Sequence, residues 1–217
     1  MVEDKNEKNR KLTPAEQRRL TAYEVISEEL AEKGYRRTEL TVGIVKANIY
    51  AILLGIPVAI IGTVLFFAVN WGKEIRLMSG VQTLLFVIAL FALIVVHELI
   101  HGITWAAFTQ NHFKDIEFGI MKEYLTPYCT CKSPLSKGKY IIGALMPLII
   151  LGIIPMAAGI AAGSMFLLLL GIIMTISAGG DILIVQTILK YKSRSEDVLY
   201  LDHPTQAGGV IFEKECM

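Results

Sequence analysis

The stretch GVQTLLFVIALFALIVVHELIHGITWAAF, which runs from Gly80 to Phe108, decides how this sequence folds. It exceeds the roughly 20 predominantly apolar residues that a helix needs to cross a bilayer. Its second half carries three ionisable side chains within five positions, at His97, Glu98 and His101. Ionisable residues are costly inside an apolar span and usually have a function there. We therefore expect a transmembrane helix that also carries a functional site.

Three further apolar runs have the length of a membrane span. The 217-residue chain is 53% hydrophobic and only 19% charged, which is more apolar than a soluble domain of this size normally buries. We predict an all-α polytopic membrane protein with about four transmembrane helices. The three additional spans are expected at about 48–69, 140–161 and 164–189.

Lysine and arginine residues lie mainly in the segments that flank the central spans. The short loop 71–79 has two of them, whereas the N-terminal segment has ten, the loop 109–139 five and the tail four. Positive charge concentrates on the cytoplasmic side of membranes, so we expect a multi-pass protein of the cell membrane with both termini and the long loop in the cytoplasm. The expected organisation is a cytoplasmic segment 1–47, a core 48–189 that includes the loop, and a cytoplasmic tail 190–217.

The charge balance also bears on partners and processing. The net charge is +1, and the basic residues lie beside acidic ones, so we expect no nucleic-acid partner. The expected partners are the lipid bilayer and a membrane-protein substrate, and the oligomeric state stays open. The first 20 residues have no apolar core that could serve as a signal peptide, and we expect none.

Two small elements are predicted outside the spans. Thr13-Pro14-Ala15-Glu16 has the spacing of a capping box, and apolar residues then recur at helical intervals up to a helix end near Gly34. This N-terminal amphipathic helix could dock on the membrane, pack on the cytoplasmic loop or be a plain solvated helix. Within the loop, the alternation of apolar and polar residues from Asp115 to Lys122, continued to Cys131, predicts a small cytoplasmic β-hairpin.

The ionisable residues of the second span have the spacing of a zinc site. On a helix, His97 and His101 project from one face a turn apart, so both imidazoles can reach one ion, while Glu98 can reach a water at that ion. A chance occurrence of this short pattern is the alternative, and the cost of burying these residues in lipid disfavours it. We predict a Zn²⁺ site with Glu98 as the catalytic residue.

A catalytic zinc ion needs a third protein ligand, and Asp181 is the candidate. It is ionisable, lies inside a later apolar span and follows Gly179 and Gly180, whose small size allows close helix approach. His101 and Asp181 both lie roughly 10–12 Å inside the same expected surface, at 1.5 Å per helical residue. Equal depth allows the two side chains to meet. The alternative for Asp181 is a polar contact with a neighbouring helix.

Three other residues are auxiliary candidates. Cys129 and Cys131 form a C-x-C pair in a loop that is expected to be cytoplasmic, where thiols stay reduced. A redox or auxiliary metal role competes with simple local packing, which is the default interpretation. His203 lies in a stretch with proline and glycine, and we interpret it as a surface turn. The alternatives are that it caps the mouth of the site or provides a ligand.

At this point the residues carry a family resemblance. The stretches HELIHG and SAGGD, together with PYCTCKSPL followed by Lys139-Tyr140 and Pro147, resemble a family of small bacterial membrane proteins known as putative zincin peptidases, over residues 85–205. The design of the site is also similar to that of the site-2 protease class of intramembrane metallopeptidases. That class has an Asn-Pro segment and Leu-Asp-Gly at its aspartate, whereas here Gly-Gly precedes Asp181 and Ile182 follows it.

The resemblance implies a zinc-dependent intramembrane peptidase that cleaves a membrane-anchored protein close to the cytoplasm. Zinc held by His97, His101 and Asp181 would polarise the peptide carbonyl, and Glu98 would move the proton. An edge strand of the region 115–131 could hold the substrate in an extended form. Two other classes stay open, namely a zinc hydrolase of a non-peptide bond and a non-enzymatic metal-binding membrane protein. Glu98 argues against the last class, because metal binding alone does not require it.

Overall fold

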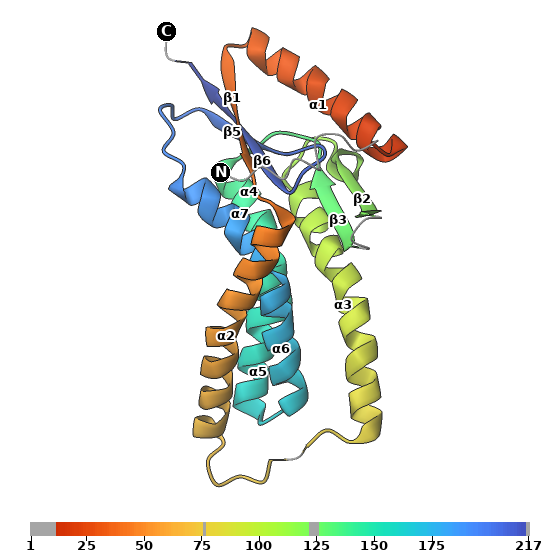
Figure 1. Cartoon of the computed structure of the whole chain (residues 1–217), viewed down its shortest axis with the longest axis vertical. Coiled ribbons are helices and arrows are strands. Elements are labelled where there is room, and N and C mark those ends of the chain that lie inside the picture. Colours follow the sequence, from red (N-terminus) through yellow and green to blue (C-terminus); the bar gives the residue numbers. More distant parts are fainter. Residues whose placement is uncertain (1–11, 76, 122–125, 216–217) are drawn as a thin grey trace.

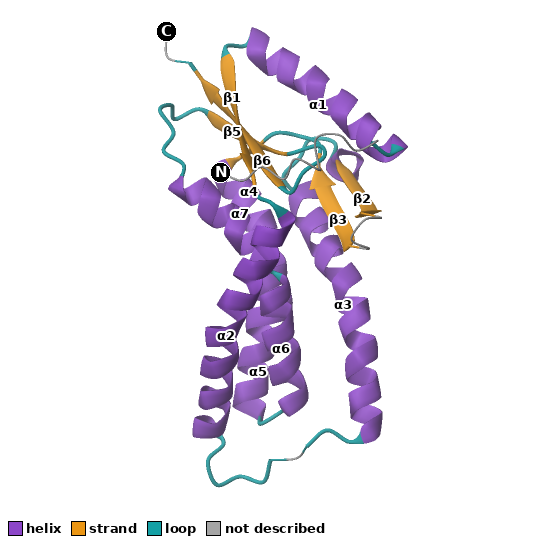
Figure 2. Cartoon of the chain, in the orientation of Figure 1, coloured by secondary structure: helices purple, strands orange, loops and turns teal. Residues whose placement is uncertain are grey.

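The computed structural model describes residues 12–75, 77–121 and 126–215, and helices dominate it (Figure 2). The long helices run side by side, and the strands gather at one end of them together with helix α1 (Figure 1). The loop and tail segments that were expected on one side of a membrane thus occupy one end of the molecule. Which side of a membrane this end faces stays a prediction.

Among the described residues, three helices are long and apolar enough to cross a membrane, and a bent pair of shorter helices would make a fourth span. Each coincides with a span predicted from the sequence to within a few residues. The three are α2 (Ile44–Val69), α3 (Gly80–Ala106) and a composite helix from Lys137 to Ala162, and the pair is α6 (Met165–Ser177) with α7 (Gly179–Lys190).

The composite helix is interrupted in its middle. It consists of α4 (Lys137–Pro147), a π-helical turn η2 (Leu148–Ile153) and α5 (Ile154–Ala162). The wide turn lies between Pro147 and Pro155, whose missing N–H groups remove hydrogen bonds that an α-helix would make. The irregularity therefore has a local cause in the sequence.

Helices α5 and α6 approach each other closely through glycine. A Cβ atom on Gly159 would lie 2.4 Å from the backbone nitrogen of Leu168, and one on Gly171 would lie 2.4 Å from the backbone nitrogen of Met156. Small residues at such crossings allow the close backbone packing that is typical of membrane helices. Helix α2 packs on the same pair, and its Phe66 is completely buried.

Helix α3 has the least protein around it. Only 6% of its most apolar window is buried, and most of its large side chains are exposed. One stripe does pack against α6 and the π-helical turn, where Phe86 meets Phe166 edge to face. The part of α3 with the three ionisable residues is its buried end, nearest the strands.

The strands form two antiparallel sheets. The first is the predicted hairpin, and it pairs Ile116 with Cys131 and Phe118 with Cys129. The second has four strands that come from the N-terminal, central and C-terminal parts of the chain. The hairpin strands are β2 (Ile116–Met121) and β3 (Thr126–Cys131), preceded by a 3-10 turn η1 (His112–Asp115); the larger sheet has the order β1 (Tyr35–Thr41), β6 (Gly208–Lys214), β5 (Val198–Asp202), β4 (Leu135–Ser136).

The four-stranded sheet is covered on both faces. On one face, Val210 and Phe212 pack against Tyr23 and Leu30 of helix α1 (Pro14–Glu32). On the other face, Ile211 and its neighbours pack against the ends of α3, α4 and α7. The sheet thus joins α1 to the end of the helix bundle that holds the ionisable residues.

Helix α1 confirms the predicted capping box. The Thr13 hydroxyl accepts a hydrogen bond from the backbone N–H of Glu16, and the Glu16 carboxylate accepts one from the backbone N–H of Thr13. The chain leaves the helix through Gly34, whose φ of +82° lies in the left-handed region that glycine tolerates. The helix packs mainly on the four-stranded sheet, and it contacts the loop through the ion pair of Arg19 with Glu117. Docking on a membrane stays a prediction.

The larger sheet corrects the expectation of an all-α chain with a single hairpin. The tail 190–217 was predicted only as a cytoplasmic tail, yet Val210, Ile211 and Phe212 are at most 1% exposed. The sheet was missed because its β1–β6 pair joins residues that are far apart in the sequence, such as Tyr35 and Lys214. Strand β6 is also buried on both sides, so it lacks the alternation of a half-buried strand.

Candidate metal site

The two histidines of the motif converge as the helical spacing predicts. Their Nε2 atoms are 3.2 Å apart and their ring centroids 4.9 Å apart, and both side chains are buried. Four residues separate them on α3, so they occupy the same face of the helix one turn apart. Two imidazole nitrogens therefore point to one position at the end of the bundle.

Asp181 completes the group. Its Oδ2 atom lies 3.1 Å from His97 Nε2 and 3.5 Å from His101 Nε2. The aspartate stands in the first turn of α7, just after the 47° bend that separates α7 from α6. Gly179 at this bend packs on α2, because a Cβ there would lie 2.4 Å from the Cβ of Ala51. The close approach of α7 to α2 therefore fixes the position of Asp181 at the start of α7.

The spacing of the three ligand atoms fits a zinc ion. Zn–N and Zn–O bonds of about 2.0–2.1 Å in a tetrahedron place neighbouring ligand atoms about 3.3 Å apart. The three distances, 3.1, 3.2 and 3.5 Å, bracket that value. Two imidazoles and one carboxylate also form the donor set of many catalytic zinc sites, which leave the fourth position free. Within the described residues, this is the group whose ligand atoms could hold a metal.

The surroundings of His101 orient its ring for this task. Its Nδ1 atom lies 2.8 Å from the carbonyl oxygen of Gly143, which can only accept, so Nδ1 carries the proton and Nε2 presents its lone pair. Trp105 stacks on the His101 ring with centroids 5.2 Å apart and donates through Nε1 to the carbonyl of Tyr140. The ring of His101 is therefore held by both α3 and α4. His97 Nδ1, in contrast, is buried and has no hydrogen-bond partner among the described residues.

Glu98 lies beside the ligand group and is partly buried. Its carboxylate interacts with the backbone N–H of Cys129 in strand β3. The hairpin thus contacts the candidate base directly, through its backbone. This contact ties the position of Glu98 to the register of a strand outside the helix bundle.

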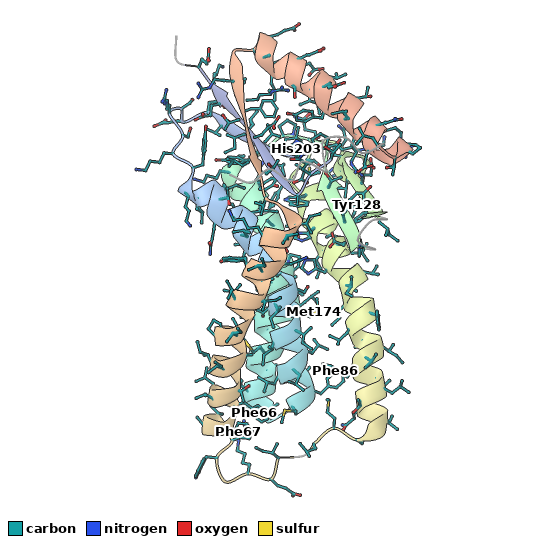
Figure 3. All side chains as sticks on the ribbon, in the orientation of Figure 1. Phe66, Phe67, Phe86, Tyr128, Met174 and His203 are labelled. Atoms are coloured by element: carbon teal, nitrogen blue, oxygen red, sulfur yellow. The ribbon has the colours of Figure 1, made fainter. Side chains whose placement is uncertain are left out.

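A cleft of about 220 Å³ leads to these residues. Glu98, His101 and Asp181 lie at its inner end, where α3 meets α7. Its sides are formed by strand β3, by the turn 203–207 between β5 and β6, and by helix α1. Figure 3 places Tyr128 of β3 and His203 of the turn in the region where the strands meet the helices.

The two cysteines lie in strand β3, and neither belongs to the candidate ligand group. Cys131 is buried and donates from Sγ to the carbonyl of Ser133, whereas Cys129 lines the cleft. Burial raises the pKa of Cys131 to about 12 and also raises the pKa of Cys129. Both thiols therefore stay protonated at neutral pH, and local packing describes Cys131. A redox or metal role for either cysteine stays an untested hypothesis.

His203 stands in a turn, as interpreted from the sequence, but the turn faces the cleft. Its Nδ1 atom accepts hydrogen bonds from the backbone N–H groups of Thr205 and Gln206, at 3.3 and 3.0 Å. It is not part of the group that could hold a metal among the described residues. His203 lines the cleft, and the alternative that it caps the site stays a hypothesis.

A partly buried carboxylate next to His203, that of Asp202, was not identified from the sequence. Asp202 accepts hydrogen bonds from the Tyr140 hydroxyl at 2.5 Å and from the backbone N–H of Cys131 at 2.7 Å. Burial raises the pKa of Asp202, and these donors oppose the rise. The residue links the larger sheet to both α4 and β3. An acidic residue in a polar tail gives no signal of this role, because its partners are 62 and 71 residues away.

Comparison with known proteins adds one finding. Residues 90–195 match a family model described as putative zincin peptidase. This match supports the resemblance to the putative zincin peptidase family that the sequence motifs carry. No curated protein and no solved structure matches the chain.

The residues that match the family model, 90–195, form only part of the cleft lining. This region contains all three candidate ligands, Glu98 and the hairpin, and so confirms the family resemblance seen in the sequence. Helix α1, strand β1 and the turn with His203 lie outside the matched residues. Residues 90–195 therefore form the inner end of the cleft. Much of the opposite wall, which we call the roof and which consists of α1, β3 and the turn 203–207, lies outside the matched residues.

Proposed function

We propose that this chain is a zinc-dependent membrane peptidase with His97, His101 and Asp181 as metal ligands and Glu98 as general base. The observation that carries the proposal is the convergence of the three ligand atoms at tetrahedral spacing, with Glu98 in the cleft that His101 and Asp181 also line. The match to a putative zincin peptidase family supports the same chemistry. A site that only stored metal would not need Glu98.

Each residue of the proposed site has a distinct role in the proposed reaction. Zinc, when bound, supplies Lewis-acid chemistry that polarises the peptide carbonyl and acidifies water. Glu98 accepts the proton of the attacking water and transfers it to the leaving amine. Cys129 lines the same cleft as Glu98, and its backbone N–H interacts with the Glu98 carboxylate. Gly143 holds the proton of His101 on Nδ1, so that this ring binds through Nε2.

The apolar helices support a location in the membrane. Exposed Leu, Ile, Val and Phe side chains cover α2 and α3, and such a surface is stable only against lipid or another apolar partner. The lysine and arginine distribution favours a cytoplasmic position for the end that carries the site. We therefore propose a multi-pass protein of the cell membrane whose substrate is a membrane-anchored protein.

The test compares wild type with Glu98→Gln. Both proteins are purified, their zinc is measured, and the proteomes of cells that express each are compared. We expect equal zinc in the two proteins, because Glu98 is not a ligand, and loss of a specific cleavage in the variant. Wild-type protein without zinc would contradict the metal site. Equal zinc with loss of a lipid product, and no change in any protein, would favour hydrolysis of a non-peptide bond.

A further inference from the structure

The cleft is lined mainly by elements outside the long apolar helices. The helices contribute its inner end, through the ends of α3, α4 and α7. Among the described residues, none that line it come from α2, α5 or α6. The remaining walls carry polar side chains, including Arg19, Thr130 and Gln206. A wall of this kind is solvated by water rather than lipid, so the cleft faces the aqueous side of the bundle.

One wall is the edge of a β-strand. In an antiparallel pair, the N–H and C=O groups of one residue point to the same side and alternate along the strand. The backbone N–H of Lys132 donates to the carbonyl of Asp115, on the side of β3 that faces β2. The backbone N–H and C=O groups of Cys131 and Cys129 therefore point away from β2. Their N–H groups indeed reach Asp202 and Glu98. The backbone carbonyl of Cys129 therefore points to the cleft side.

Pro127 shares this outward side of β3, because it stands two residues before Cys129. A proline has no N–H, and in sheets it is found at edges where no strand pairs. No strand of the described chain pairs with this edge of β3. The edge therefore presents backbone carbonyl acceptors beside Glu98. It offers no unpaired N–H group from Pro127, Cys129 or Cys131. An extended peptide that supplies N–H groups complements it by strand addition.

One side chain of helix α1, that of Arg19, reaches across this edge. Arg19 donates from Nε to the carbonyl of Pro204 at 3.0 Å and from Nη1 to Glu117 Oε1 at 3.2 Å, and it also contacts the Tyr128 hydroxyl. Its guanidinium lies 4.4 Å from the centre of the Tyr128 ring. Arg19 is only 9% exposed. It thus bridges the turn on one side of the cleft and the hairpin on the other.

We propose that the site accepts an extended polypeptide segment from the aqueous side, laid along the outer edge of β3 beneath α1, with Arg19 as the latch that limits its entry. The inference rests on the proposed peptidase function and specifies its substrate. The segment that is cut is the extramembrane, extended part of a membrane-anchored protein rather than an apolar transmembrane helix. A helical substrate is disfavoured because its backbone groups are already paired, and they cannot pair with a strand edge.

The test measures binding to zinc-loaded protein in lipid nanodiscs. One probe is a fluorescent, water-soluble tetrapeptide hydroxamate, and the other is an apolar peptide hydroxamate of about 20 residues that stays in the bilayer. We expect the soluble probe to bind, as measured by fluorescence anisotropy, and the membrane-confined probe not to compete with it. Arg19→Met should accelerate association of the soluble probe about tenfold, because charged hydrogen bonds that hold the latch are lost.

The matched control is Arg18→Met, which changes an exposed arginine of the same helix. It should leave the association rate unchanged, and all three proteins should hold equal zinc. An equal rate in Arg19→Met and wild type would overturn the latch. Binding of the membrane-confined probe alone, which needs no variant, would overturn entry from the aqueous side and leave the peptidase proposal intact. Wild-type protein that binds no zinc would overturn the peptidase proposal and this inference with it.

Discussion

The inner end and the roof of the cleft are built in opposite ways. At the inner end, His97, Glu98 and His101 lie within five residues of one helix, and Asp181 adds the third candidate ligand from another helix. In the roof, α1, β3 and the turn after β5 come from three distant parts of the chain. The proposed chemistry therefore depends on residues of two helices, whereas the proposed control of access depends on segments that only the fold brings together.

The largest effect is expected when the third candidate ligand, which comes from another helix than the two histidines, is removed. Asp181→Ala should lower zinc affinity at least about 100-fold, because loss of a direct ligand exceeds the 10–100-fold effect of outer partners. Chelator competition measures the affinity. Asp197→Ala, which removes an exposed carboxylate, is the control and should bind zinc as wild type does. Unchanged zinc affinity in Asp181→Ala would show that the third ligand lies elsewhere.

A smaller effect is expected from the bend that positions Asp181. In Gly179→Ala, the new Cβ would lie 2.4 Å from the Cβ of Ala51, so α7 must move away from α2. Overpacking of this kind costs about 1–3 kcal/mol, and we expect a lower thermal midpoint together with weaker zinc binding.

The adjacent glycine provides a matched control. A Cβ on Gly180 meets nothing within 4 Å, so Gly180→Ala should be neutral or slightly stabilising. Equal behaviour of the two alanine variants, by thermal unfolding and chelator competition, would contradict the role of the α2–α7 contact in positioning the aspartate.

The same contrast explains what the sequence could predict. The helices and ligands could be predicted because charged residues are rare in apolar spans, so His97, His101 and Asp181 stand out, and their depth can be estimated by counting residues. The larger sheet could not, because its pairs join distant residues. The run Gly208-Gly209-Val210-Ile211-Phe212 is a short apolar stretch that could have indicated a buried strand. Its partners had no comparable signal, since β1 carries Arg36, Arg37 and Glu39.

The smallest expected effect concerns the turn in the roof. Burial, assisted by Arg37 and opposed by Glu39, lowers the pKa of His203. Protonation of Nδ1 would also place a donor against the N–H groups of Thr205 and Gln206. The proton therefore binds the unfolded chain more tightly. The contribution of His203 to stability is complete above the ordinary pKa of about 6.5, and it is lost as the pH falls below that value.

His203→Gln isolates this contribution, because glutamine offers an acceptor oxygen and does not titrate. Between about pH 7.5 and pH 5.5, which bracket the ordinary imidazole pKa, the thermal midpoint of metal-free wild type should fall more than that of the variant. The ligand histidines titrate in both proteins, so the difference between the two slopes reports His203. An equal change of the thermal midpoint with pH in the two proteins would mean that protonation of His203 does not destabilise the fold. The hydrogen bonds of the turn would then contribute little to stability. A steeper wild-type slope would make the roof the part of the cleft that responds to acid, while its inner end responds to metal.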